Sequence, residues 1–366
     1  MNKFIFSLLF VLICPQTSFA SGKVLIILSS EDKITLQQDV VHETGFFLSE
    51  LMRPVKRLLD EGFELEFANP KGNPAILDQL SDDARWFASE EEYNDIRALC
   101  EKLGLCGEDR IGTVALRKLS TISDQEISQY KGVFVPGGHA PMEDLLKDDE
   151  VGRLLGTFNI SERPIALICH GTIALLATLQ NPQAFIDALT ELHELETYAD
   201  ERKAEHERIA QEMAALGREV DRLKERAKTQ NRSITAIKIQ LIFYKLHRQY
   251  HEFSSNKVLE EQSRDRIEEL KKALKTLSSD WPFANYKMTS FSASEEIILE
   301  LGGTDGLLGG QTLFYPDEAL RYAGADVDVK GRIWESKVVV DRNLVTGRNP
   351  NSDYGVMEEF LKLIRK

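Results

Sequence analysis

Short apolar runs and helical apolar periods alternate along the first part of the chain. Residues 23–28 (KVLIIL) form an apolar run, and apolar side chains then recur at helical spacing over 47–58. Gly62 ends this period, and residues 63–67 alternate between apolar and polar side chains, which is typical of a strand. A strand, a helix and a strand in this order predict a βαβ unit and therefore a parallel sheet.

The same alternation continues towards the carboxyl end. Further strands are predicted at 130–135, 164–168, 286–291, 338–341 and 343–345. Helices are predicted at 144–158, 316–324 and 354–364, and residues 74–125 have a mostly helical pattern. The predicted fold class is therefore α/β, with a mostly parallel sheet between helices.

A long charged segment, poor in glycine, separates Leu179 from Trp281. Its apolar residues step by four and three, as the core positions of a coiled coil do: Ile209, Met213, Leu216, Val220, Leu223 and Ala227, then Ile234, Ile237, Leu241 and Tyr244, and finally Ile267, Leu270, Leu274 and Leu277. This pattern predicts a coiled-coil insertion at 186–280 within a domain made of 21–185 and 281–366. Because both ends return to one domain, we expect an antiparallel helical hairpin that turns near 229–233, with arms of about 60 Å.

Composition narrows the range of partners. With 28% charged and 42% apolar residues the chain has an ordinary globular composition, and its net charge of −14 argues against nucleic-acid binding. The coiled coil offers a surface for a homodimer or for a protein partner. A solvated hairpin that packs only on itself fits the same pattern.

The first twenty residues have the three regions of a secretory signal peptide. Lys3 precedes an apolar run over 4–14, which ends in Ser18-Phe19-Ala20, so we expect cleavage after Ala20. The mature protein is then periplasmic or secreted. No later segment is apolar enough to predict a membrane span.

The most suggestive stretch for chemistry is PIALICHG, residues 164–171. An apolar strand ends at Cys169, and a helical apolar period follows at once, so Cys169 is predicted to lie on a sharp strand-to-helix turn. Gly171 is the small residue that such a turn needs. A thiol at this edge of a sheet and at the start of a helix is a candidate nucleophile. The alternative is a small, buried, inert cysteine.

Cys100 and Cys106 are the other cysteines of the predicted mature protein. Gly104 ends the helical pattern between them, which would let the two thiols meet in a disulfide and leave Cys169 as the free thiol. Two reduced residues in the core of a short helix fit equally well.

Other polar residues are less informative by themselves. Gly137 and Gly138 follow the strand at 130–135 and would leave backbone N–H groups open to an anionic oxygen. Glu50 reads as a surface carboxylate, and Glu296 as a charge in the first turn of a helix.

Five separated segments resemble, in order, the signature segments of the ThiJ/PfpI superfamily, within the class I glutamine amidotransferase-like fold. They are GFFLSE (45–50), PGGHAPMEDL (136–145), ALICHG (166–171), MTSFSASEE (288–296) and LVTGRNPNS (344–352). They are most similar to its branch of heat-shock chaperones and glyoxalase III-like proteins. The resemblance implies a flavodoxin-like three-layer α/β sandwich, interrupted here by the coiled coil.

The resemblance also implies a site. The nucleophile falls on Cys169 and its base on His170, while the acidic residue that contacts the thiol falls on Glu50 and the third member of the triad on Glu296. The implied oxyanion and substrate-binding residues are Gly137, Gly138, His139 and Gly171, with the N–H groups of Gly138 and His170 as the oxyanion donors. The chain departs from the family pattern at Ala140 and Thr172.

Three functions follow as hypotheses. The first is a glyoxalase III-like enzyme that needs no cofactor and no metal and converts small α-oxoaldehydes such as methylglyoxal to hydroxy acids. The second is a cysteine peptidase or amidase with the same triad. The third is a stress chaperone, or a redox-sensing assembly protein, that binds its partner through the coiled coil. The resemblance further implies that a homodimer is common.

Overall fold

The computed structural model describes residues 22–227, 245, 263–300 and 307–366. The predicted signal peptide and the predicted turn at 229–233 lie outside these residues. So do the apolar positions from Ile234 to Tyr244.

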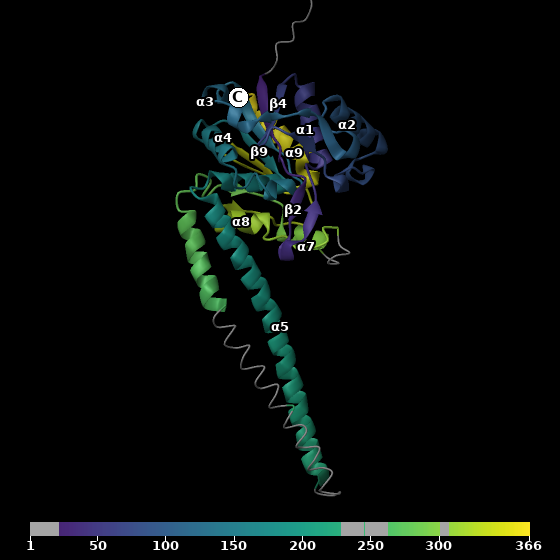
Figure 1. The fold of residues 1–366 in the computed structure, drawn as a ribbon, viewed down its shortest axis with the longest axis vertical. Coiled ribbons are helices and arrows are strands. Elements are labelled where there is room, and N and C mark those ends of the chain that lie inside the picture. The colour runs from purple at the N-terminus through teal and green to yellow at the C-terminus, as the bar shows by residue number, and fades with distance from the viewer. Residues whose placement is uncertain (1–21, 228–244, 246–262, 301–306) are drawn as a thin grey trace, which may run out of the picture.

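A seven-stranded sheet forms the centre of the molecule (Figure 1). Its strands, in spatial order, are β12 (Val338–Asp341), β13 (Leu344–Gly347), β9 (Ile165–Ile168), β8 (Tyr130–Val135), β1 (Lys23–Ile27), β4 (Glu64–Asn69) and β7 (Arg117–Lys118). All neighbours are parallel except β12 and β13, which form an antiparallel hairpin. The predicted parallel sheet is confirmed.

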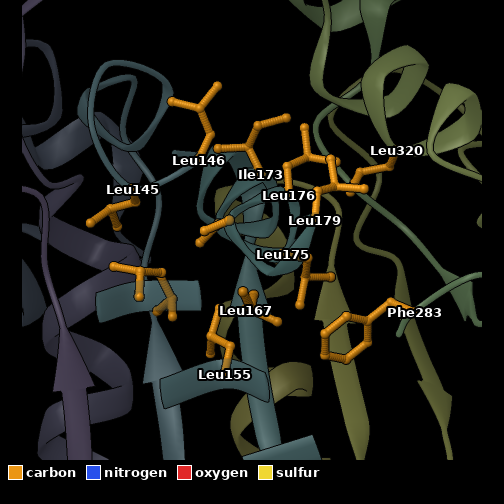
Figure 2. Close-up of a cluster of buried hydrophobic side chains, with 14 of the residues drawn as sticks. Leu145, Leu146, Leu155, Leu167, Ile173, Leu175, Leu176, Leu179, Phe283 and Leu320 are labelled. Atoms are coloured by element: carbon orange, nitrogen blue, oxygen red, sulfur yellow. The ribbon is translucent and has the colours of Figure 1, made fainter. Parts of the chain in front are cut away.

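Helices cover both faces of this sheet. One face carries α1 (Leu48–Asp60), α9 (Asp353–Ile364) and, outside them, α2 (Glu90–Lys102); the other carries α4 (Asp149–Ile160), α8 (Pro316–Tyr322) and a 3-10 helix, η7 (Cys169–Thr178). Alternate residues of β1 face opposite ways, Val24 towards α1 and Leu25 towards α4. Figure 2 shows leucine, isoleucine and phenylalanine side chains packed around η7, on the side of the sheet that carries α4 and α8. The flavodoxin-like three-layer sandwich is therefore confirmed.

Two predictions from the pattern are wrong. Residues 286–291 do not join the central sheet: β10 (Lys287–Met288) pairs with β11 (Asp326–Val327), because β12 already covers the open edge of β13. Residues 74–125 are only partly helical, since β5 (Pro74–Ile76) and β6 (Ile111–Ala115) form a hairpin around α2.

The remaining elements are short. β2 (Lys33–Thr35) and β3 (Val41–Glu43) form a small antiparallel pair. Single turns lie between the main elements: η1 (Gln37–Asp39), η2 (Gln79–Ser81), η3 (Ala84–Trp86), η4 (Glu108–Arg110), η5 (Leu119–Thr121), α3 (Asp124–Ile127), η6 (Ala140–Met142) and η9 (Pro350–Ser352). A longer helix, α7 (Ala293–Glu300), follows β10.

A long helix, α5 (Pro182–Ala227), leaves the sandwich, and a helix over 263–277 lies beside its first part (Figure 1). Leu189 and Leu192 of α5 are buried in the same cluster as Leu270 and Leu274. Two ion pairs join the helices, Arg266 with Glu191 at 2.6 Å and Lys271 with Glu196 at 2.9 Å. The helix begins four residues before the predicted boundary, because its first turns anchor in the core of the sandwich through Phe185 and Ile186. None of the described helices is both long and apolar enough to span a bilayer.

Candidate active site

Cys169 lies directly after β9, at the carboxyl edge of the sheet. Its φ of 57° is in the left-handed region, which a non-glycine residue adopts only under constraint. Gly171 packs so closely on the carbonyl of Pro136 that a side chain there would overlap it. The Thr172 hydroxyl donates to the Cys169 carbonyl at 2.8 Å and is bonded to Ser290 at 2.6 Å. The elbow predicted from the sequence is thus present and held on both sides.

His170 links the thiol to Glu296. The Sγ atom of Cys169 is 3.3 Å from His170 Nδ1, and His170 Nε2 is 2.6 Å from Glu296 Oε2. Burial and the neighbouring charge of His139 lower the pKa of His170 to about 4. The imidazole is therefore neutral at pH 7. With its Nε2 proton donated to Glu296, its Nδ1 lone pair can accept the proton of the thiol.

Glu296 also binds a second histidine. His139 Nε2 lies 2.8 Å from Glu296 Oε1, and the ring centroids of His139 and His170 are 4.0 Å apart. Burial alone would raise the pKa of Glu296, but the two histidines outweigh it and hold this pKa well below its usual range. Burial lowers the pKa of His139, yet Glu296 raises it by more. The sequence placed His139 among the substrate-binding residues but did not predict this pairing.

Glu50 is fully buried in the first turn of α1, so its interpretation as a surface carboxylate is wrong. Its Oε2 atom accepts the Gly137 N–H at 3.0 Å. Burial raises the pKa of Glu50 to about 8, although a hydrogen bond with Cys169 acts in the other direction. Burial, and then the charge of Glu50, raise the pKa of the Cys169 thiol. A protonated Glu50 can therefore donate to the sulfur once the thiol has lost its own proton.

The glycine turn after β8 serves two purposes. Gly137 gives its N–H to Glu50, and a side chain at this position would overlap the Glu50 carboxylate. Gly138, with a φ of +90°, lines the cavity beside the thiol together with His139 and His170. Gly138 and His170, whose N–H groups are expected to bind an oxyanion, both line this cavity. The N–H of Gly137 is already used by Glu50.

A buried ion pair supports the helix that holds Glu296. Arg348 Nε is 2.9 Å from Glu295 Oε2, and both side chains are almost fully buried. Asn349 Nδ2 donates to Glu295 Oε1 at 2.8 Å. Sequence reasoning missed this pair, although an arginine directly after the buried strand β13, within a signature segment, was a signal for it.

The cavity over Cys169 is apolar, with a volume of about 540 Å³ when its open mouth is included. Four aromatic side chains line it: Phe47, Trp86, Phe291 and Trp334. Leucines also line it, together with the charged residues Asp78 and Arg85. The two tryptophans were not predicted, because they lie far apart in sequence and outside the signature segments.

Two further expectations concern cysteines and metals. Cys100 and Cys106 form a disulfide with a Cα–Cα distance of 5.4 Å, and Cys169 is the free cysteine of the described residues. Within that part of the chain, one group could hold a metal ion: His139, His170 and Glu296, whose ligand atoms lie within 4.8 Å of one another. These atoms already satisfy one another by hydrogen bonds.

Part of the chain is similar to known proteins. A family model described as ThiJ/PfpI family-like matches residues 41–206. A protein/nucleic acid deglycase HchA of Pseudomonas aeruginosa is 32% identical over 166 residues, covering 44% of this chain and 53% of that protein. An HchA deglycase of Staphylococcus aureus is 29% identical over 158 residues, which cover 42% of this chain and 50% of that protein. The chain thus spans about half the length of the curated relatives it matches.

Solved structures share the fold. Glyoxalase III of Candida albicans superposes with a TM-score of 0.54 at 17% identity, covering 94% of this chain and 98% of that chain. The Rapid Encystment Protein of 24 kDa from Francisella tularensis superposes with a TM-score of 0.52, also at 17% identity. The superposition covers 94% of this chain and 99% of that chain. At such identities the similarity concerns the fold alone.

Proposed function

Because the chain belongs to the ThiJ/PfpI superfamily, we propose that it is an enzyme of the glyoxalase or deglycase type, acting on small α-oxoaldehydes with Cys169 as nucleophile. The observation that carries this proposal is the line of contacts from the Cys169 thiol through His170 to Glu296. A thiol, a neutral imidazole and an ionised carboxylate are thus linked in series, with His170 between the other two, which is the arrangement that an activated cysteine nucleophile requires. Relatives named as deglycases support the reaction class.

The reaction begins with proton transfer from the thiol to His170 Nδ1. The sulfur adds to the aldehyde carbon C1, and His170 returns the proton to the aldehyde oxygen, which gives a hemithioacetal. Glu296 stabilises the imidazolium form in between, and the N–H groups of Gly138 and His170 face the developing oxyanion. No added cofactor is needed for this step, since the chain supplies both acid and base.

An internal redox step then follows. His170 removes the hydrogen of C1 as a proton and a proton adds to the C2 oxygen, which gives an enediol. C2 then takes up a proton while the C1 hydroxyl loses its own, so C1 is oxidised and the C2 ketone is reduced to an alcohol. The product is a thioester of Cys169. Water hydrolyses it to a hydroxy acid and the free thiol, so that the sum is one aldehyde plus one water to one hydroxy acid.

The burial of Cys169 bears on the redox-sensor alternative. Sensor cysteines are exposed and have a lowered pKa, whereas Cys169 is 3% exposed and its pKa is raised by burial. A peptidase or amidase would use the same contacts, and a chaperone role would rest on α5 and the helix at 263–277.

We further propose that the mature protein works in the periplasm or outside the cell, where a disulfide such as Cys100–Cys106 persists.

The test uses the protein from residue 21 onwards with methylglyoxal and no glutathione. Consumption of the aldehyde and formation of lactate should both occur, and Cys169→Ala should abolish both while leaving thermal unfolding unchanged. Peptide and amide substrates are assayed in parallel. Turnover of those alone would replace the glyoxalase proposal with the hydrolase, and equal aldehyde turnover by the variant would remove Cys169 from the reaction.

A further inference from the structure

We propose that the cavity over Cys169 is a slot for a flat apolar group, and that the preferred substrates are α-oxoaldehydes with an aryl substituent rather than a methyl group. This inference rests on the proposed function and names its substrate class.

The slot is built from a continuous series of aromatic rings. Phe47 contacts Trp86 edge to face with centroids 5.1 Å apart, and Trp86 and Trp334 are 6.2 Å apart. Trp334 in turn lies 5.7 Å from Phe291, whose ring is 4.4 Å from that of His170. Aromatic contacts therefore run without a break from Phe47 to the proposed base, His170.

Hydrogen bonds hold the ring of Trp86 and the backbone of Trp334. Trp86 Nε1 donates to the Leu80 carbonyl at 2.8 Å, so the indole N–H has no need of a ligand. The Trp334 backbone N–H donates to Glu295 Oε1 at 2.8 Å, and Asn351 donates to its carbonyl at 2.7 Å. The fixed Trp86 ring contacts the ring of Trp334, and the two form an apolar surface that a flat group can bind with little loss of freedom.

The aromatic surface that lines the cavity is larger than a molecule of methylglyoxal could cover. Its single methyl group offers little area for contact with these rings, and Trp86 and Trp334 are only half-buried in the free protein. An aryl group on C2 would pack against several rings, while its aldehyde carbon reached the thiol. Aromatic pairs attract each other beyond the effect of buried area. Since even one methylene in an apolar pocket changes discrimination about tenfold or more, an aryl group should exceed that.

The first measurement compares kcat/KM for phenylglyoxal and methylglyoxal. We expect phenylglyoxal to be preferred at least about tenfold, and Trp334→Ala and Trp86→Ala to bring the ratio of the two kcat/KM values, phenylglyoxal over methylglyoxal, most of the way to one. The matched control is Trp281→Phe, because Trp281 is the third tryptophan and lies away from the slot, bonded to the Leu175 carbonyl. A ratio near one, or a ratio that Trp334→Ala leaves unchanged, overturns the slot.

A second measurement does not need turnover. Acetophenone and acetone differ in the same way as the two aldehydes, and each is tested for protection of the Cys169 thiol against iodoacetamide, followed by mass spectrometry. Acetophenone should protect at concentrations at which acetone does not, and Trp334→Ala should abolish that protection. Equal protection overturns the slot. Selective protection without turnover of either aldehyde leaves the slot standing and overturns the proposed function.

Discussion

His170 Nε2 lies 2.6 Å from Glu296 Oε2, and the other oxygen of this carboxylate is bonded to His139. One buried carboxylate therefore orients two imidazole rings and balances the charge that either ring acquires. Glu296→Gln cannot accept two N–H groups or carry that charge, so kcat/KM should fall about 100-fold or more. Steady-state kinetics with an α-oxoaldehyde measure this.

The matched control for this substitution is Glu300→Gln. Glu300 lies one turn further along α7 and accepts hydrogen bonds from Thr312 and Tyr315 instead. Its variant should keep nearly full activity. Equal losses in the two variants would mean that charge on α7, rather than the contact with His170, supports the reaction.

The pKa of His170, about 4, predicts an unusual pH profile. An ordinary histidine base loses activity below pH 6.5 because it becomes protonated. Here the neutral form persists to lower pH, so kcat/KM should stay level from pH 7 to below pH 5.5 and fall only as the pH approaches 4. Rates are measured across this range in buffers of constant ionic strength, and an inflection near 6.5 would contradict the assignment of His170 as base.

Glu50 should make the protein less stable as the pH rises. Its pKa is about 8 in the folded protein, against an ordinary value of 4.5, so the folded state holds a proton that the unfolded state has lost between these values. The free energy of unfolding therefore falls through this window. Glu50→Gln removes this dependence, and its stability relative to wild type should improve from pH 5 to pH 8.5 in urea unfolding. Glu90→Gln, an exposed change on α2, should leave the wild-type slope intact.

The buried pair of Arg348 and Glu295 should be costly to break. Arg348→Met leaves the Glu295 carboxylate buried without its cation, and we expect a loss of about 3–5 kcal/mol in the free energy of unfolding. Arg266→Met, which breaks the exposed pair with Glu191, should change stability little. Similar losses in the free energy of unfolding for the two substitutions would show that burial does not determine how much each ion pair contributes to stability.

Sequence pattern sufficed for the features that depend on neighbouring residues. Each strand of the parallel sheet, and the elbow at Cys169, lies within a short stretch whose apolar spacing is unambiguous. The strand predicted at 286–291 failed because local pattern does not say which sheet edge is already covered, and β12 covers it.

The site depends on contacts that pattern cannot reveal. Glu296 and His170 are 126 positions apart, with the whole helical insertion between them. The burial of Glu50, and the meeting of Trp86 with Trp334, arise only when separate loops reach one edge of the sheet. The resemblance supplied Glu50 and Glu296, but neither resemblance nor pattern supplied His139 as the second partner of Glu296.

The length of α5 determines how the protein moves in solution. Its 46 residues extend about 70 Å, whereas a compact chain of 366 residues has a radius of gyration of only about 21 Å. Such an arm raises the friction of a monomer out of proportion to its mass. A single chain should therefore elute early from a sizing column and sediment slowly, with the apparent mass of a larger assembly, while light scattering returns its true mass.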